Sequence, residues 1–169
     1  MPFFDDEFYR SRFHKEPEYL PWIFKWMMDR DFDYSKEEDK RIMQVAMLIL
    51  QTRGLSIAEY SWDLFTTKKL LSWELLEDLY AIKNRLDRVE PLSKEYMNLI
   101  KELGAELKGK SAEFIECLGA LYSECWHYYR SKTNKAETIK RVAKLLKLKP
   151  TDPVLDEAWQ SVMKFIDVW

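Results

Sequence analysis

The sequence predicts an all-α fold in a single domain that spans residues 1–169, and three observations support this prediction. Apolar residues recur at spacings of three and four along every long stretch, which is the period of one helix face. Ser, Asn, Asp, Pro and Gly stand where helices begin and end. No stretch alternates polar and apolar residues as a half-buried β-strand does. We therefore expect about eight helices in a compact array or an elaborated bundle.

The composition agrees with a folded domain of this size. Of the 169 residues, 47% are apolar, which is ample for one hydrophobic core. Charged residues make up 33% of the chain but give a formal net charge of only −2, so charge repulsion does not favour disorder. Lys and Glu are frequent whereas Gly, Gln and Asn are rare, a balance typical of heat-adapted proteins. We therefore expect a thermophilic source.

In the first half of the chain, helix starts and stops are indicated by Ser and Gly residues. Ser35 with Glu38 matches the capping box, in which two side chains three residues apart satisfy the first free N–H groups of a helix. Ser56 with Glu59 matches it again, and Gly54 suits a left-handed helix end. The predicted helices here are Asp5–Lys15, Pro21–Asp29, Lys36–Arg53, Ile57–Thr67 and Trp73–Val89.

The second half shows the same punctuation. Asn134 with Glu137 forms a third capping box. Simpler N-cap residues are Ser72, Ser93, Ser111 and Asp152. The predicted helices here are Lys94–Leu107, Ala112–Ser131, Lys135–Lys149 and Pro153–Val168. The helix from Ala112 is the most aromatic, and its inward face is predicted to be Phe114, Leu118, Leu121, Tyr122, Cys125 and Tyr129.

Motifs for catalysis, cofactors or metals are few. The chain has only two histidines, His14 and His127. Glu124 and His127 have the Glu-x-x-His spacing of di-iron sites in helical bundles, but such a site needs the motif twice and the chain has it once. No glycine-rich phosphate loop or nucleophile elbow is present, so we expect no cofactor. A metal protein or enzyme centred on Glu124 and His127 is the least favoured alternative.

The cysteines and the apolar stretches indicate where in the cell the protein is expected. Cys117 and Cys125 lie in one predicted helix, about 12 Å apart along its axis at 1.5 Å per residue, so they cannot form a disulfide with each other. Both fall near the apolar stripe, where buried and inert thiols are common. No basic-then-apolar leader opens the sequence, and the most apolar stretch, Ile42–Leu50, is too short to span a membrane. We therefore expect an intracellular, cytoplasmic protein without a membrane helix.

Charge is distributed unevenly near the end of the chain. Residues 130–149 carry eight Lys and Arg residues against one acidic residue, Glu137. In the predicted helix Lys135–Lys149 the apolar residues occupy one face, so the cations form an exposed strip next to an aromatic segment, 126–129. Basic surfaces beside aromatic rings are typical of proteins that bind phosphate backbones and stack bases. We call the residues predicted to bind nucleic acid the basic strip. They are Tyr128, Arg130, Lys132, Lys135, Lys140, Arg141, Lys144 and Lys147.

These observations predict a non-catalytic helical binding or assembly subunit that contacts DNA or RNA through the basic strip. Two other interpretations of the strip stay open: an ordinary solvated helix face, whose cations favour the helix C-terminus, and a site for an acidic protein. The alternative function is a protein-interaction module or a homo-oligomer, because the chain is rich in aromatic residues. The aromatic residues predicted to be exposed for that purpose are Phe3, Phe4, Trp22, Trp26 and Trp169.

Overall fold

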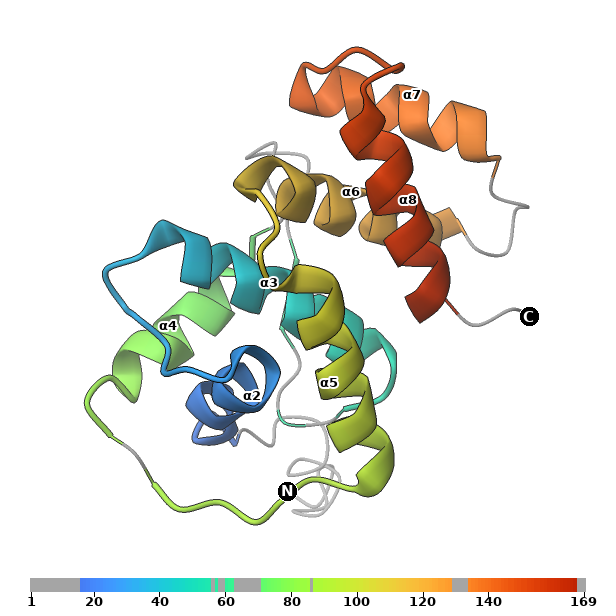
Figure 1. The fold of residues 1–169 in the computed structure, drawn as a ribbon. Coiled ribbons are helices and arrows are strands. Elements are labelled where there is room, and N and C mark those ends of the chain that lie inside the picture. The colour runs from blue at the N-terminus through green and yellow to red at the C-terminus, as the bar shows by residue number, and fades with distance from the viewer. Residues whose placement is uncertain are drawn as a thin grey trace, which may run out of the picture.

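The computed structural model describes residues 16–55, 57, 60–62, 71–85, 87–128 and 134–166, without the side chains of residues 127 and 128. In this part of the chain the regular structure consists of seven helices and no β-strand, so the predicted all-α fold class is confirmed. The helices are α2 (Tyr19–Met28), α3 (Glu37–Thr52), α4 (Trp73–Ala81), α5 (Lys94–Leu107), α6 (Ala112–Tyr128), α7 (Lys135–Leu146) and α8 (Pro153–Phe165) (Figure 1).

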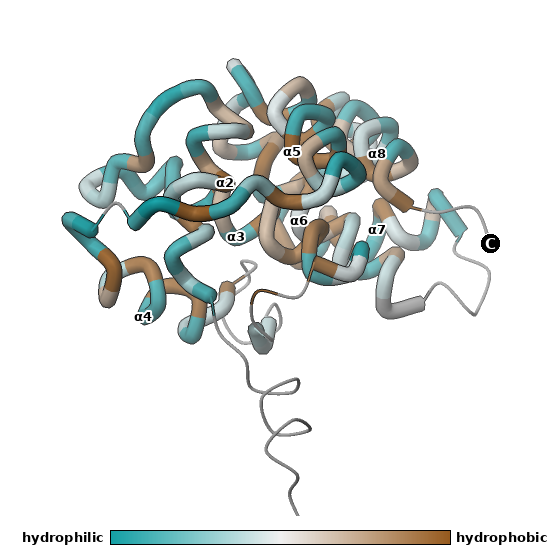
Figure 2. Tube along the Cα trace, turned by 90° about the horizontal axis from the view of Figure 1, so that it is seen from below, coloured by the Kyte–Doolittle hydropathy of each residue, from teal (hydrophilic) through white to brown (hydrophobic). Residues whose placement is uncertain are grey.

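Helix α3 lies at the centre of the fold. Every residue from Ile42 to Leu50 is buried, which requires packing on all sides of this helix. Helices α5 and α6 both pack against α3, α2 packs on α5, and α8 packs on α6. Figure 1 shows α6, α7 and α8 as one group above α2 to α5, with α7 at the edge of the molecule. Figure 2 shows hydrophobic segments where α5, α6 and α8 meet and hydrophilic segments along the outer turns.

Local cap chemistry determines most of the helix starts. Four predicted N-cap side chains accept hydrogen bonds from backbone N–H groups two or three residues ahead, at 3.0 to 3.3 Å: Ser72, Ser111, Asn134 and Asp152. The prediction for Ser35 is wrong, because Lys36 is the N-cap residue of α3 and makes no side-chain cap bond. Ser35 instead donates its N–H and its hydroxyl to Oδ1 of Asp33, at 2.9 and 2.6 Å.

The predicted helix Ile57–Thr67 is wrong at residues 57 and 60–62, which are not helical. The side-chain amide of Gln51 donates to the carbonyl of Tyr60 and accepts from its N–H, both at 3.1 Å. These bonds take the place of the intrahelical bonds that Tyr60 would otherwise make. Ile57 and Tyr60 are both buried, so their apolar character reflects packing of an irregular segment. The other residues of this predicted helix lie outside the described part.

Three further predicted helices are too long, among them the last, because α8 ends at Phe165 rather than Val168 and Ile166 is extended. Helix α4 ends at Ala81 rather than Val89, and Asn84 adopts a left-handed conformation with φ of 67° in the turn that follows. Helix α7 ends at Leu146 rather than Lys149, because Lys147 is left-handed with φ of 58°. The N–H of Leu148 then donates to the carbonyl of Ala143 at 2.8 Å, closing the helix end. The predicted helix at residues 5–15 lies outside the described residues.

Candidate nucleic-acid interface

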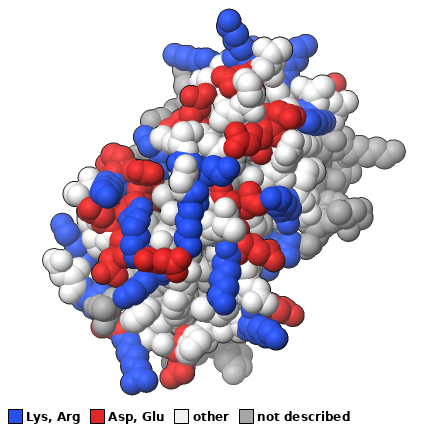
Figure 3. All heavy atoms as spheres, in the orientation of Figure 1, with Lys and Arg blue, Asp and Glu red and all other residues white. Residues whose placement is uncertain are grey.

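Helix α7 and its C-cap residue present three exposed lysines. Its buried residues, Thr138, Val142 and Ala143, face α6 and α8, so the opposite side of α7 points away from the fold. Lys140 and Lys144 are exposed four residues apart on one side of α7, and Lys147, the exposed C-cap residue, follows directly after the helix. We call these three residues the α7 lysine row. Figure 3 shows basic side chains projecting from the upper edge of the molecule, where Figure 1 places α7.

The structure turns two other members of the predicted basic strip toward neighbouring helices. Nζ of Lys135 lies 2.6 Å from Oδ1 of Asp156 on α8, and this hydrogen bond lowers the pKa of Asp156. Nε of Arg141 lies 3.3 Å from Oε2 of Glu124 on α6. In the described part of the chain no carboxylate pairs with a lysine of the α7 lysine row. The predicted strip is therefore divided into paired cations at its flanks and three unpaired cations at its centre.

The remaining members of the basic strip are not placed by the structure. Arg130 and Lys132 lie outside the described residues. Tyr128 is the last residue of α6, and its side chain lies outside the described part as well. The structure thus places five of the eight predicted residues on α7 and its C-cap, and the predicted aromatic stacking contact stays a prediction.

Acidic residues border the α7 lysine row. Asp156 and Glu157 near the start of α8 are exposed, and each pairs with a lysine elsewhere on the surface. Glu137 is exposed on α7 itself, three residues before Lys140. In Figure 3 acidic side chains lie directly below the basic ones at the upper edge. The positive surface is therefore narrow, about the width of one helix, or 10–12 Å.

Glu124 has a role that the sequence analysis missed. Its side chain is 8% exposed and forms the buried partner of Arg141, which is half exposed. The neighbouring thiol of Cys125 is buried, and burial raises its pKa to about 12, as it does for Cys117. Neither thiol is therefore a ready nucleophile. Among the described residues no group of three or more His, Cys, Asp and Glu side chains could hold a metal ion.

The aromatic residues predicted to be exposed are placed differently. Trp22 and Trp26 are only half exposed and pack against each other with ring centroids 6.1 Å apart. Nε1 of Trp22 donates to the carbonyl of Asp87 at 2.7 Å, so this indole fastens the segment before α5. Phe3, Phe4 and Trp169 lie outside the described residues. Within the described segments the exposed large apolar side chains are Trp73, Tyr80, Trp126 and Met163.

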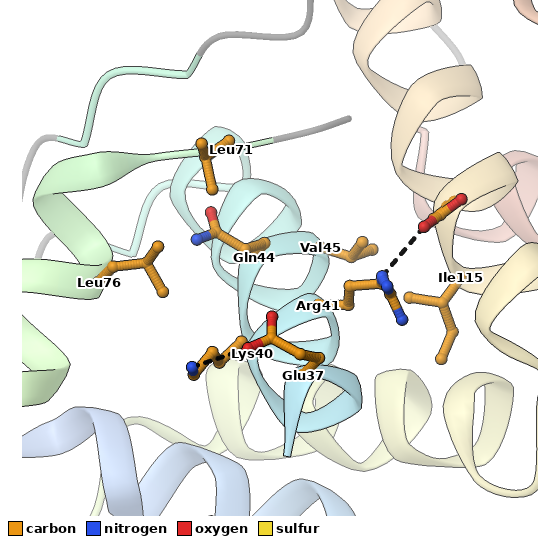
Figure 4. Close-up of a pocket in the computed structure, with 9 residues that line it drawn as sticks. Glu37, Lys40, Arg41, Gln44, Val45, Leu71, Leu76 and Ile115 are labelled. Carbon is orange, nitrogen blue, oxygen red and sulfur yellow. Dashed lines mark hydrogen bonds and ion pairs between the residues drawn. The ribbon is translucent and has the colours of Figure 1, made fainter. Parts of the chain in front are cut away.

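A separate cavity of about 130 Å³ lies between α3, α4 and α6 (Figure 4). Its apolar wall consists of Val45, Leu71, Leu76 and Ile115. Its polar rim contains two ion pairs, from Nζ of Lys40 to Oε1 of Glu37 and from Nε of Arg41 to Oε1 of Glu116, each 3.0 Å long. Gln44 also lines the cavity, and its amide is bonded to the backbone of Ser72. No sequence pattern indicates this site, because its residues come from three separated segments.

Comparison of the chain with protein-family models, curated proteins and solved structures finds no match. None of the helices in the described segments has the length and apolar character needed to cross a membrane.

Proposed function

We propose that the protein is a non-catalytic helical binding protein that contacts the phosphate backbone of nucleic acid through the α7 lysine row. The observation that carries this proposal is the contrast between the three lysines and their neighbours. Lys135 and Arg141 are paired with carboxylates, whereas Lys140, Lys144 and Lys147 have no carboxylate partner in the described part of the chain. An exposed, unpaired ammonium group is available to a phosphate and releases a counterion when it binds one.

The chemistry of the α7 lysine row favours backbone contact over sequence recognition. Lysine acts as a point charge, whereas reading a base edge depends on side chains with paired donors and acceptors, such as Arg, Asn and Gln. Contacts to phosphate fix the position of a protein on nucleic acid but carry no sequence information. We therefore expect weak binding that depends strongly on salt and little on sequence, with a dissociation constant of roughly 10⁻⁴ to 10⁻⁶ M at physiological salt.

The experiment compares two triple variants that remove the same charge. In the first, Lys140, Lys144 and Lys147 are replaced by Ala; in the second, three exposed lysines elsewhere are replaced, namely Lys36, Lys94 and Lys101. Fluorescence anisotropy with labelled single- and double-stranded DNA and RNA at about 50 mM salt gives the affinities. The first variant should bind at least about tenfold more weakly than the wild type, whereas the control should change by less than about twofold.

A reciprocal variant strengthens the same experiment. Glu137→Gln removes the negative charge that lies on α7 beside the α7 lysine row, so it should tighten binding. If both triple variants weaken binding equally, the effect is one of net charge and the α7 lysine row is not the site. Undetectable binding of the wild type at low salt would also contradict the proposal.

A protein-interaction module is the second candidate function, and helix α4 favours it. Trp73 and Tyr80 are 64% and 49% exposed and lie seven residues apart, on the same side of α4. Exposed aromatic side chains are enriched where proteins meet. Size-exclusion chromatography with light scattering tests this candidate, because a homo-oligomer built on α4 should dissociate in a Trp73→Ala variant.

A further inference from the structure

The cavity between α3, α4 and α6 has the volume of a small organic molecule. At about 130 Å³ it could hold roughly four waters at their liquid volume of about 30 Å³ each. Four aliphatic side chains form its wall, and two of them, Val45 and Ile115, are buried. Apolar walls with a few polar groups are typical of small-molecule sites, because the walls bind the apolar part and the polar groups fix its orientation.

Arg41 is the polar group best placed to meet a ligand. Its ion pair with Glu116 runs from Nε, and among the described residues no acceptor bonds to its two terminal amino groups. Figure 4 shows the guanidinium group of Arg41 between Val45 and Ile115, beside the apolar wall. A guanidinium group with both terminal amino groups available matches the two oxygens of a carboxylate.

The other polar groups of the rim already have partners. Nζ of Lys40 pairs with Glu37 and lies 5.3 Å from the ring centroid of Tyr80. The amide of Gln44 accepts from the N–H of Ser72 at 2.8 Å and donates to its carbonyl at 3.3 Å. Among the described residues that line it, a ligand therefore meets one available guanidinium group and an aliphatic wall.

We propose that this cavity binds a small organic carboxylate with a short, branched apolar tail. The carboxylate lies on the terminal amino groups of Arg41, and the tail packs against Val45, Leu76 and Ile115. Such a group belongs either to a free short-chain acid or to an aliphatic α-amino acid. The two sources differ in the ammonium group, which in an amino acid would face the carboxylates of Glu37 and Glu116.

The test is an NMR titration of the full chain, labelled with ¹⁵N, against isovalerate and against valine. Either compound should cause saturable shifts at the residues that line the cavity, with a dissociation constant in the range of about 0.1 to 10 mM. Tighter binding of valine identifies an amino acid as the source, and tighter binding of isovalerate identifies a simple acid. The absence of saturable shifts with both compounds would overturn the proposal.

Two variants and a control locate the site. Arg41→Gln should weaken binding at least about tenfold, because it removes the group that pairs with the carboxylate. Arg85→Gln is the matched control, since it also breaks an arginine–carboxylate pair, at 2.6 Å from Asp87, but lies outside the cavity. Leu76→Phe keeps Arg41 and fills the cavity, so it too should abolish the shifts. Unchanged affinity in both Arg41→Gln and Leu76→Phe would overturn the proposal, whatever the effect on folding.

Discussion

Asp39 is a buried charge whose partners are all in place. Its two carboxylate oxygens accept hydrogen bonds from the terminal nitrogens of Arg30, each at 2.7 Å, and Oδ2 also accepts from the N–H of Asp33 at 2.9 Å. The hydrogen bond with Asp39 raises the pKa of Arg30. Asp39 thereby fastens the loop between α2 and α3. In the sequence it stands beside Glu37 and Glu38, and no motif indicates that it pairs with Arg30.

Replacing Asp39 by Asn should therefore be costly. The variant leaves Arg30 without a counter-charge and turns an NH₂ group toward donors, so we expect a loss of about 2 to 4 kcal/mol in the free energy of unfolding. Asp31→Asn is the matched control, because Asp31 is 82% exposed in its pair with Lys25, and it should change stability by less than about 0.5 kcal/mol. Urea denaturation measures both, and equal effects would contradict a special role for Asp39.

Gly104 allows α2 and α5 to approach closely. A Cβ atom at this position would lie 2.1 Å from the carbonyl oxygen of Met27, which is backbone and cannot move aside alone. In an unpacked helix Gly→Ala gains about 1 kcal/mol, but here we expect Gly104→Ala to lose about 1 to 3 kcal/mol. Gly109→Ala is the control, since its Cβ would meet open space and only its φ of 72° opposes the change. A Gly104→Ala variant as stable as the wild type would contradict this packing.

At the scale of elements, the sequence predicted what is local and missed what depends on distant partners. Helix α5 begins and ends where it was predicted, because a Ser cap and an apolar period lie within the helix itself. The segment after α3 was predicted wrongly, because the amide of Gln51 binds the backbone of Tyr60 across the turn. A side chain that competes for backbone groups leaves no periodic signal in the sequence.

The basic strip shows the same limit. The apolar period of α7 predicts the burial of Val142 and Ala143, although not that of Thr138, and so the exposure of its lysines could be foreseen. The sequence could not show which of the cations pair with carboxylates, because their partners, Glu124 and Asp156, belong to α6 and α8. The cavity beside Arg41 was missed for the same reason, since three segments far apart in the sequence form it.

The contact between α5 and α8 predicts a pH-dependent stability. Oε2 of Glu106 accepts from the hydroxyl of Ser161 at 2.7 Å, and Oε1 pairs with Lys164. Burial raises the pKa of Glu106, but the hydrogen bonds from Lys164 and Ser161 together lower it by more than burial raises it. The pKa in the folded protein therefore lies below the ordinary 4.5. The ionised form is therefore favoured by folding. The stability that the ionised Glu106 contributes is fully present above pH 4.5 and is lost as the pH falls through the pKa of Glu106 in the folded protein.

Glu106→Gln should accordingly be less stable than the wild type at neutral pH by about 1 to 2 kcal/mol, and the difference should be smaller at about pH 3 than at neutral pH. Urea denaturation at the two pH values measures this difference. Glu102→Gln, at an exposed position one turn earlier, is the control and should show little effect at either pH. A stability difference for Glu106→Gln that is independent of pH would contradict the ionic contribution.

At the scale of the whole molecule, fold class and function differ in how far the sequence determines them. The helical period recurs along most of the chain, so the all-α class was predictable from many independent signals. The net charge of −2 gives no overall attraction to nucleic acid, so any binding must come from a local surface. Helix α7 offers such a surface at the edge of the molecule, and the acidic start of α8 limits its width (Figures 1 and 3).

The salt dependence of nucleic-acid binding tests most directly whether the α7 lysine row contacts phosphates. The logarithm of the binding constant falls with the logarithm of salt concentration by about 0.9 per phosphate contacted on duplex DNA and about 0.7 on single strands. If the α7 lysine row makes three contacts, replacing Lys140, Lys144 and Lys147 by Ala should reduce the magnitude of this slope by about 2 to 3. The triple variant of Lys36, Lys94 and Lys101 should keep the wild-type slope. A slope that is unchanged by loss of the α7 lysine row would contradict the proposed interface.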